Sequence, residues 1–309
     1  MATTLLQTKL YSPSIRPGLV PRPHLIKKLN DGLDEQLTLI SAPPGFGKTT
    51  LVIEWLRSLE RPFTWLTLDE EDNDLSRFLT YFITALQKIK VDLGQAALSA
   101  ISRSQSPPTG SLWTVLFNEI VEFDSHFVFV LDDYHAIHTL NIHEAINFLL
   151  QNLPPQMHLV VISRADPPLY LSRLRVQQKM TEIRENDLRF TSAESSLFLN
   201  KCMGLTLSSE NIATLRDKTE GWVAGLQLAA LSLQDEEDVA GFIQAFAGSH
   251  HYFVGYLVEE VLNRRPQGTV TSCCRHQSLI GLRPVYVMVL PGDKIARKSS
   301  TCFKRQTSS

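Results

Sequence analysis

The sequence lacks the features that would place the protein in a membrane or outside the cell. Its 309 residues contain no uninterrupted apolar run of about 18 residues, the length that a membrane-spanning helix needs. The N-terminus, MATTLLQTKLYSPSIRPG, contains no apolar segment of the kind found in secretion signals. Only four cysteines are present and none has metal-ligand spacing, which indicates a reducing compartment rather than a disulfide framework. We therefore expect a cytoplasmic protein with no membrane partner.

An excess of charge of one sign is also absent. Lys and Arg number 30 against 32 Asp and Glu, which gives a formal net charge of −2 at pH 7. The protein as a whole therefore generates no field that attracts nucleic acid. Hydrophobic residues make up 43% of the chain, enough for a substantial core without disulfides. At roughly 100–200 residues per domain, this length suggests two domains.

Short apolar runs alternate with segments of helical spacing over the first two thirds of the chain. Near-continuous apolar strands are typical of a parallel sheet with helices on both faces, so we expect an α/β, doubly wound parallel sheet. From residue 192 onward the apolar spacing becomes helical throughout, which predicts an appended helical subdomain. The predicted strands are 37–42, 63–69, 126–133 and 157–165, with 181–190 as one more candidate. The predicted helices are 25–33, 49–59, 77–89, 111–122, 141–152, 192–202, 208–221, 222–234 and 239–263.

A phosphate-binding loop lies between the first predicted strand and the helix that follows it. The sequence APPGFGKT (42–49) ends in the Gly-Lys-Thr of the pattern G-x-x-x-x-G-K-[ST], with Ala42 in place of the first glycine. Glycines permit positive φ, which lets backbone N–H groups approach phosphate oxygens. Lys48 would reach the β and γ phosphates, and the Thr49 hydroxyl would bind magnesium. We assign nucleotide binding to Gly45, Phe46, Gly47, Lys48, Thr49 and Thr50, with ATP and Mg²⁺ as the ligands.

Charged residues at the ends of other predicted strands complete the expected site. Asp132 is assigned to the magnesium ion, and Asp133 to the attacking water; the alternative is that both acids cap the following turn. Arg164 follows the strand 157–163 and would sense the γ-phosphate; the alternative is a surface ion pair. Arg22 precedes the first helix, where it would line the adenine side.

The order and spacing of these motifs resemble one known family. LISAPPGFGKTT, TWLTLDEEDNDLSRFLTYF, VLDDYHAI, VISRADPPLYLSRLR and TEGWVAGLQLAAL are similar to the N-terminal ATPase of MalT-type, large LuxR-family transcriptional regulators. These regulators belong to the STAND class of P-loop ATPases. The resemblance covers about residues 5–270 and includes LQTKLYSPSIRPGLVPRPHLIKKL near the N-terminus. The matching site positions are residues 45–49, Asp132, Asp133 and Arg164. The resemblance further implies that the segment around Gly221, Trp222 and Gly225 contacts the nucleotide side.

The resemblance implies a switch rather than a metabolic enzyme. In this family, inducer and ATP promote self-association, and slow hydrolysis resets the protein. Inducer-sensing repeats and a DNA-binding helix-turn-helix follow the ATPase, and we expect this chain to be too short to hold them. The expected parts are a segment leading into the nucleotide site (1–30), the P-loop ATPase domain (31–190), a helical subdomain with the start of a winged helix (191–270), and a tail (271–309).

The tail differs in composition from the rest of the chain. It holds three of the four cysteines and seven Lys or Arg residues against the single acid Asp293. One interpretation is a nucleic-acid-binding arm. The other is a frameshift: loss of one base near the Val270 codon would turn the family's winged-helix sequence into this tail. We favour the frameshift, and expect residues 271–309 to be out of frame and disordered.

We therefore expect an ATP-binding signal-transduction module with slow hydrolysis at most, without sensor and DNA-binding domains. The expected partners are ATP or ADP, further copies of the chain, or full-length relatives, and direct DNA binding is not expected. A stand-alone P-loop ATPase and a non-catalytic interaction fragment or pseudogene product are the alternatives.

Overall fold

The computed structural model describes residues 5–14, 18–103, 109–234 and 238–245 of the chain. Sequence predictions for residues 271–309, and for most of 239–263, lie outside these ranges. Within the described ranges, no helix combines the length and the apolar character that crossing a bilayer requires.

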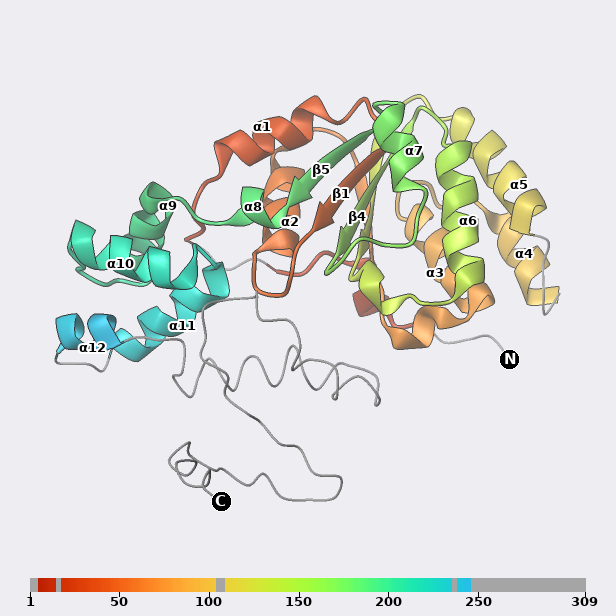
Figure 1. The fold of residues 1–309 in the computed structure, drawn as a ribbon. Helices are drawn as coiled ribbons and strands as arrows, with labels where there is room; N and C mark the ends of the chain where they lie inside the picture. The colour runs from red at the N-terminus through yellow and green to blue at the C-terminus, as the bar shows by residue number, and fades with distance from the viewer. Residues whose placement is uncertain (1–4, 15–17, 104–108, 235–237, 246–309) are drawn as a thin grey trace, which may run out of the picture. The chain divides into compact units, whose positions relative to one another are not determined.

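A five-stranded parallel sheet in the order β2-β3-β4-β1-β5 organises the first part of the chain (Figure 1). Every residue of the three central strands is buried, because helices cover both faces of the sheet. This arrangement confirms the predicted doubly wound α/β fold. The strands are β1 (Leu37–Ser41), β2 (Phe63–Thr67), β3 (Phe127–Asp132), β4 (Met157–Ser163) and β5 (Met180–Arg184).

Each central strand contributes to two separate cores, because successive side chains of a strand point to opposite faces. In β3, Val128 and Val130 pack with one layer of helices, and Phe129 and Leu131 pack with the other. The first layer consists of α1 (Pro23–Asp31) and α2 (Lys48–Ser58). On the opposite face lie α3 (Leu75–Leu86), α4 (Gln95–Arg103), α5 (Thr109–Val121), α6 (Leu140–Gln151) and α7 (Leu171–Val176) (Figure 1).

The segments predicted to be helical after residue 192 are helical wherever the structure describes them. Two positive-φ residues, Glu220 (φ 52°) and Gly221 (φ 71°), end one of these helices and turn the chain into the next. The elements are α8 (Glu185–Leu188), α9 (Ser192–Ser196), the π-helix η4 (Leu197–Cys202), α10 (Ser209–Thr219), α11 (Val223–Leu233) and α12 (Val239–Ala245). Short 3-10 turns complete the set: η1 (Gln7–Leu10), η2 (Glu70–Asn73) and η3 (Tyr134–Ala136).

Three local predictions need correction. The strand predicted at 181–190 ends at Arg184, because the Asp187 carboxylate accepts a 2.8 Å hydrogen bond from the Arg184 N–H and starts α8 there. Helix α4 lies where no element is predicted from the sequence; only Ala97 and Ile101 along it are buried. Helix α7 was also not predicted, because its six residues are too few to show a helical period.

The strand that carries the predicted magnesium ligand is not the neighbour of the P-loop strand. Strand β4 lies between β1 and β3 and pairs with both. Asp132 therefore ends a strand that lies two positions from β1 in the sheet. The carboxyl ends of all three strands nevertheless open at the same edge of the sheet, where ligands of open α/β sheets bind.

Candidate nucleotide-binding site

The P-loop follows β1 and enters α2, as the sequence predicts. Gly45 and Gly47 have φ values of 78° and 77°, a region that favours glycine because it has no Cβ. Gly47 is the N-cap residue of α2, so the positive end of that helix faces the concave side of the loop. A Cβ added at Gly47 would meet no atom within 4 Å, so φ rather than space restricts this position to glycine. The open space beside a helix N-terminus fits a phosphate group.

Lys48 lies at the first position of α2 and is buried. Its Nζ donates a 3.0 Å hydrogen bond to the carbonyl oxygen of Pro43 and thereby folds back over the loop. The pKa of Lys48 is lowered to about 8, first by burial and then by the positive charge of Arg164, while the carboxylates of Asp133 and Asp132 act in the opposite direction. A buried ammonium group with a second cation nearby creates a strong demand for an anion.

The side chains of Thr49 and Asp132 are in contact, although β4 lies between β3 and β1 in the sheet. The Thr49 hydroxyl lies 3.3 Å from each carboxylate oxygen of Asp132. The Asp132 carboxylate is 3% exposed and also accepts a 2.9 Å hydrogen bond from the Asp133 N–H. A hydroxyl and a carboxylate are oxygen ligands of the type that Mg²⁺ prefers, so the donor set fits the expected metal.

The carboxyl group of Asp132 is poorly solvated. Its pKa is raised to about 7, first by burial and then by the neighbouring Asp133 charge. Hydrogen bonds from the Asp133 N–H and Thr49 and the charge of Lys48 act in the opposite direction. A buried acid in a cleft with such a shift is a typical functional group. A divalent cation would favour its ionised form.

Asp133 differs in exposure and backbone from its neighbour. Its φ of 55° is unusual for a residue with a side chain, and its carboxylate is 42% exposed. The side chain forms no capping bond to the following turn η3, so the capping interpretation does not hold for Asp133. The residue after it, Tyr134, is buried, and its hydroxyl lies 3.0 Å from Nδ1 of His143. This contact anchors the turn that holds Asp133 in its conformation.

Arg164 directly follows β4, the strand between those of the P-loop and Asp132. Its positive charge contributes to the lowered pKa of Lys48. The residue before it, Ser163, is 1% exposed, and its hydroxyl has no hydrogen-bond partner among the described residues. Ser163 is not among the predicted site residues, because a serine at the end of a strand has no sequence pattern that indicates a role.

Arg22 forms its hydrogen bonds with the segment that follows β5. The shortest are 2.9 Å to Oε1 of Glu194 and 2.8 Å to the Leu188 carbonyl. Its guanidinium also lies over the Phe190 ring, 5.2 Å from the centroid. These contacts fix the start of α1 against α8 and α9. The adenine-side role of Arg22 stays a prediction.

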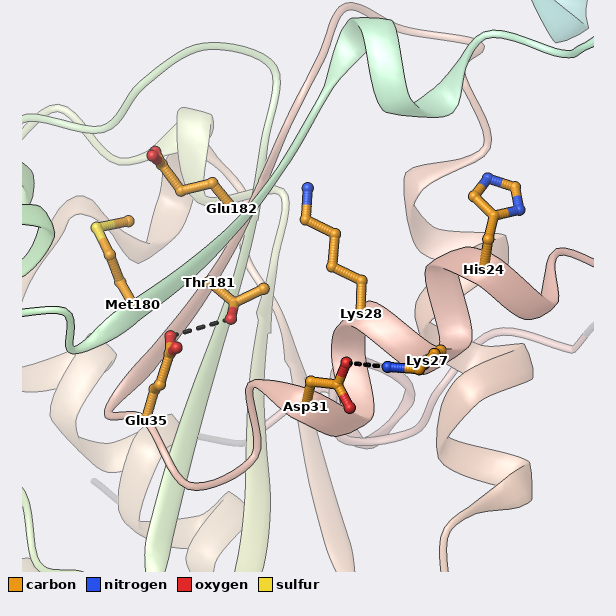
Figure 2. Close-up of a pocket in the computed structure, with 8 residues that line it drawn as sticks. All are labelled: His24, Lys27, Lys28, Asp31, Glu35, Met180, Thr181 and Glu182. Carbon is orange, nitrogen blue, oxygen red and sulfur yellow. Dashed lines mark hydrogen bonds and ion pairs between the residues drawn. The ribbon is translucent and has the colours of Figure 1, made fainter.

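A cavity of about 470 Å³ lies elsewhere, between α1 and β5 (Figure 2). Its walls carry charges of both signs, among them Lys28, Glu35 and Glu182. Glu35 precedes β1, and Met180 begins β5, so this cavity is near the amino ends of the strands, whereas the P-loop follows a carboxyl end. None of the predicted site residues lines it, and we do not assign the nucleotide to it.

One contact of the P-loop was only indicated by the family resemblance. The indole Nε1 of Trp222 donates a 3.0 Å hydrogen bond to the Pro44 carbonyl, and the Ala224 N–H donates a 3.0 Å bond to the Gly45 carbonyl. The start of α11 therefore touches the loop directly. Spacing along the sequence could not reveal this contact, because it joins residues 178 positions apart.

Comparison with known proteins identifies the relatives of the chain. No family model matches the sequence. The HTH-type transcriptional regulator MalT of Klebsiella pneumoniae is 31% identical over 304 residues, which is 98% of this chain and 34% of that protein. MalT of Yersinia pestis is 34% identical over the same shares, and MalT of Vibrio cholerae is 33% identical over 261 residues, 84% of this chain and 29% of its own. The chain thus spans about a third of the length of these relatives.

Among solved structures, a signal transduction ATPase with numerous domains (STAND) from Pyrococcus horikoshii, which carries a tetratricopeptide repeat sensor, has a TM-score of 0.53. The match covers 77% of this chain and 33% of that one, at 14% identity, so it shows the fold alone. The sequence matches add the closer relationship. Over 98% of its length the chain is 31–34% identical to about a third of MalT-type transcriptional regulators, and it shares the fold of a STAND ATPase.

Proposed function

We propose that the chain is the ATP-binding switch module of a MalT-like regulator, with slow ATP hydrolysis at most. The observation that carries the proposal is the convergence of Lys48, Thr49 and Asp132 at the N-terminus of α2. These are the three chemical groups that a triphosphate with magnesium requires; Lys48 and Thr49 begin α2, and Asp132 ends β3.

The loop and Lys48 would bind the phosphates. The N-terminus of α2 supplies backbone N–H groups and a partial positive charge. Lys48 would exchange its hydrogen bond to the Pro43 carbonyl for a phosphate oxygen, and the phosphate charge would raise its pKa from about 8. The anion thus stabilises a charged side chain that is otherwise buried next to a second cation.

Thr49 and Asp132 would hold the metal. When bound, Mg²⁺ neutralises and orients phosphate oxygens. The Thr49 hydroxyl would turn from Asp132 toward the metal, and the carboxyl group of Asp132 would remain ionised. The protein would therefore bind nucleotide more tightly with magnesium than without it.

Asp133 and Arg164 are the residues we propose for hydrolysis. The half-exposed Asp133 carboxylate would orient a water molecule, and Arg164 would face the charge of the terminal phosphate. A switch has to keep its nucleotide long enough to signal, so the expected turnover is slow. Fast turnover of the purified chain without an activator would instead favour a stand-alone ATPase.

We assign the nucleotide switch to these 309 residues. We assign neither inducer sensing nor DNA binding to them. The relatives are HTH-type transcriptional regulators, and the chain spans about a third of their length. We infer that inducer sensing and DNA binding belong to other parts of such regulators. We further propose that nucleotide binding controls association with other copies or with full-length relatives.

Equilibrium binding of ATP and ADP, with and without magnesium, tests the proposal. The Lys48→Ala variant is expected to lose measurable binding while keeping its circular dichroism spectrum. Lys27→Ala is the matched control, because Lys27 is exposed on α1 and pairs only with Asp31 in the described structure; it should bind as the wild type does. Unchanged ATP affinity in Lys48→Ala would show that the loop assignment is wrong.

A further inference from the structure

The helical part of the protein holds the outer side of the P-loop. Trp222 and Ala224, at the start of α11, donate hydrogen bonds of 3.0 Å to two successive loop carbonyls, those of Pro44 and Gly45. The Trp222 ring also lies beside the Phe46 ring, with 6.4 Å between the centroids. The loop and α11 therefore meet through both polar and aromatic contacts.

These two hydrogen bonds determine the direction of the loop N–H groups. A trans peptide holds its N–H opposite its C=O, and the described chain contains no cis peptide. Because the Pro44 and Gly45 carbonyls point toward α11, the N–H groups of Gly45 and Phe46 point away from it. Backbone N–H groups that point to one side are what a phosphate cradle needs.

The position of Trp222 is itself tightly fixed. The carbonyl of Gly221 accepts a 2.8 Å hydrogen bond from the Phe190 N–H, and a Cβ at Gly221 would lie 2.6 Å from the Phe190 carbonyl oxygen. On the other side, a Cβ at Gly225 would lie 2.8 Å from Cε3 of the Trp222 ring. Glycines on both sides thus let the indole lie close to the backbone and reach Pro44.

We propose that Trp222 is a positioning residue of the nucleotide site, which holds the P-loop carbonyls and couples nucleotide occupancy to α11. The inference rests on the proposed function, because it concerns the same loop. A bound phosphate orients the loop N–H groups from one side, and Trp222 orients the same peptide groups from the other. Each therefore stabilises the contact made by the other.

The Trp222→Phe variant tests the inference. Phenylalanine keeps an aromatic ring beside Phe46 and removes only the donor to the Pro44 carbonyl. We expect ADP affinity to fall about three- to tenfold, the effect of losing one neutral hydrogen bond. Trp113→Phe is the control for loss of an indole, since Trp113 is buried and its indole N–H has no hydrogen-bond partner among the described residues. The Trp113→Phe variant should have lower stability than the wild type but the same ADP affinity.

A second measurement separates positioning from a purely structural role. Saturating ADP should raise the melting temperature less in Trp222→Phe than in wild type and Trp113→Phe. Equal ADP affinity and equal ADP-induced stabilisation in Trp222→Phe would overturn the inference. If the wild type bound no nucleotide, the proposed function itself would fail, and that outcome is distinguishable.

Hydrogen exchange of the wild-type protein tests the coupling between the P-loop and α11 even if Trp222→Phe does not fold. The Ala224 amide donates to the Gly45 carbonyl, so ADP should slow exchange in the peptide that contains residues 222–226. Exchange there that is the same with and without bound ADP would contradict the coupling. Slower exchange confined to that peptide and the P-loop would support it.

Discussion

The hydroxyl of Thr49 lies 3.3 Å from both carboxylate oxygens of Asp132, although β4 lies between β3, which carries Asp132, and β1, which precedes the P-loop. Thr49 is in the first turn of α2, and Asp132 is the last residue of β3. The contact between two potential metal ligands therefore depends on the strand order and is not a consequence of local sequence.

The first prediction concerns Asp132→Asn. An amide is a weaker ligand for Mg²⁺ than a carboxylate, so the variant should lose most of the gain in nucleotide affinity that magnesium provides. Binding in the presence of EDTA should change less than about threefold, because the loop and Lys48 are intact. Titrations with labelled ADP, with and without magnesium, measure both quantities. A magnesium effect equal to that of the wild type would reject the metal-ligand role.

The second prediction is the pH dependence of the same group. Because burial raises the pKa of Asp132 to about 7, its proton must leave before Mg²⁺ binds. The magnesium-dependent part of nucleotide binding should therefore weaken as pH falls from 8 to 6, by about tenfold per unit well below the pKa.

The raised pKa of Asp132 also affects stability without ligand. A carboxyl group with a raised pKa favours folding below its unfolded value of 3.8, and this contribution is lost as pH rises through about 7. Metal-free Asp132→Asn should therefore be more stable than wild type at pH 8, by on the order of 1–3 kcal/mol. Urea unfolding at pH 8 and pH 5 checks this, since the difference should shrink at pH 5.

Most of the fold could be predicted from the sequence because its signals are local. The apolar runs in β1, β3 and β4 indicate strands that are buried on both faces. The Gly-Lys-Thr at 47–49 indicates a turn with positive φ before a helix. The order of the strands could not be predicted, because it depends on how helices cross the sheet. Short helices such as α4 bury too few side chains to show a period.

The partners of single site residues were harder to predict than the site itself. Arg22 lies in a motif next to the first helix, yet its hydrogen bonds go to residues 165 to 172 positions away. The contact of Trp222 with Pro44 is equally remote in sequence. Only tertiary structure pairs such groups, whereas the composition of the loop alone predicts its chemistry.

The third prediction concerns His158, a buried residue at the start of β4. Its Nδ1 lies 2.8 Å from the Glu35 carbonyl and its Nε2 lies 2.9 Å from the Thr38 hydroxyl. The carbonyl can only accept, so Nδ1 carries the proton and Nε2 accepts from Thr38. Burial lowers the pKa of His158 from 6.5 to about 4. A lowered pKa means that stability is full above pH 6.5 and is lost as pH falls toward 4.

We expect His158 to account for a loss on the order of 1–3 kcal/mol in unfolding free energy over that range. The variant His158→Gln should be less stable at pH 7 but should lack this part of the slope. The measurement is best made in Asp132→Asn, because Asp132 changes stability in the opposite direction over the same pH range. Identical slopes with and without the His158→Gln change would exclude the histidine as the cause.

The fourth prediction concerns residues 271–309, which lie outside the described residues. The frameshift hypothesis predicts that resequenced source DNA restores a winged-helix reading frame near codon 270. The matches to MalT of Klebsiella pneumoniae and Yersinia pestis span 98% of the chain, and the match to MalT of Vibrio cholerae spans 84%. An unchanged reading frame on resequencing would reject the frameshift.

The fifth prediction concerns Gly221, the residue before Trp222. Its φ of 71° costs about 1–2 kcal/mol for any residue with a Cβ, and that Cβ would lie 2.6 Å from the backbone oxygen of Phe190. Gly204→Ala is the matched control, because Gly204 has a φ of 72° but open space around the added Cβ. Gly204→Ala should lose only the conformational part of the stability and bind ADP normally.

Gly221→Ala should lose more stability and also bind ADP more weakly, because relief of the clash must move the chain that carries Trp222 to the P-loop. Chemical unfolding and ADP titration of both variants measure the two effects. Equal ADP affinity in the two variants would mean that the loop does not depend on the position of α11.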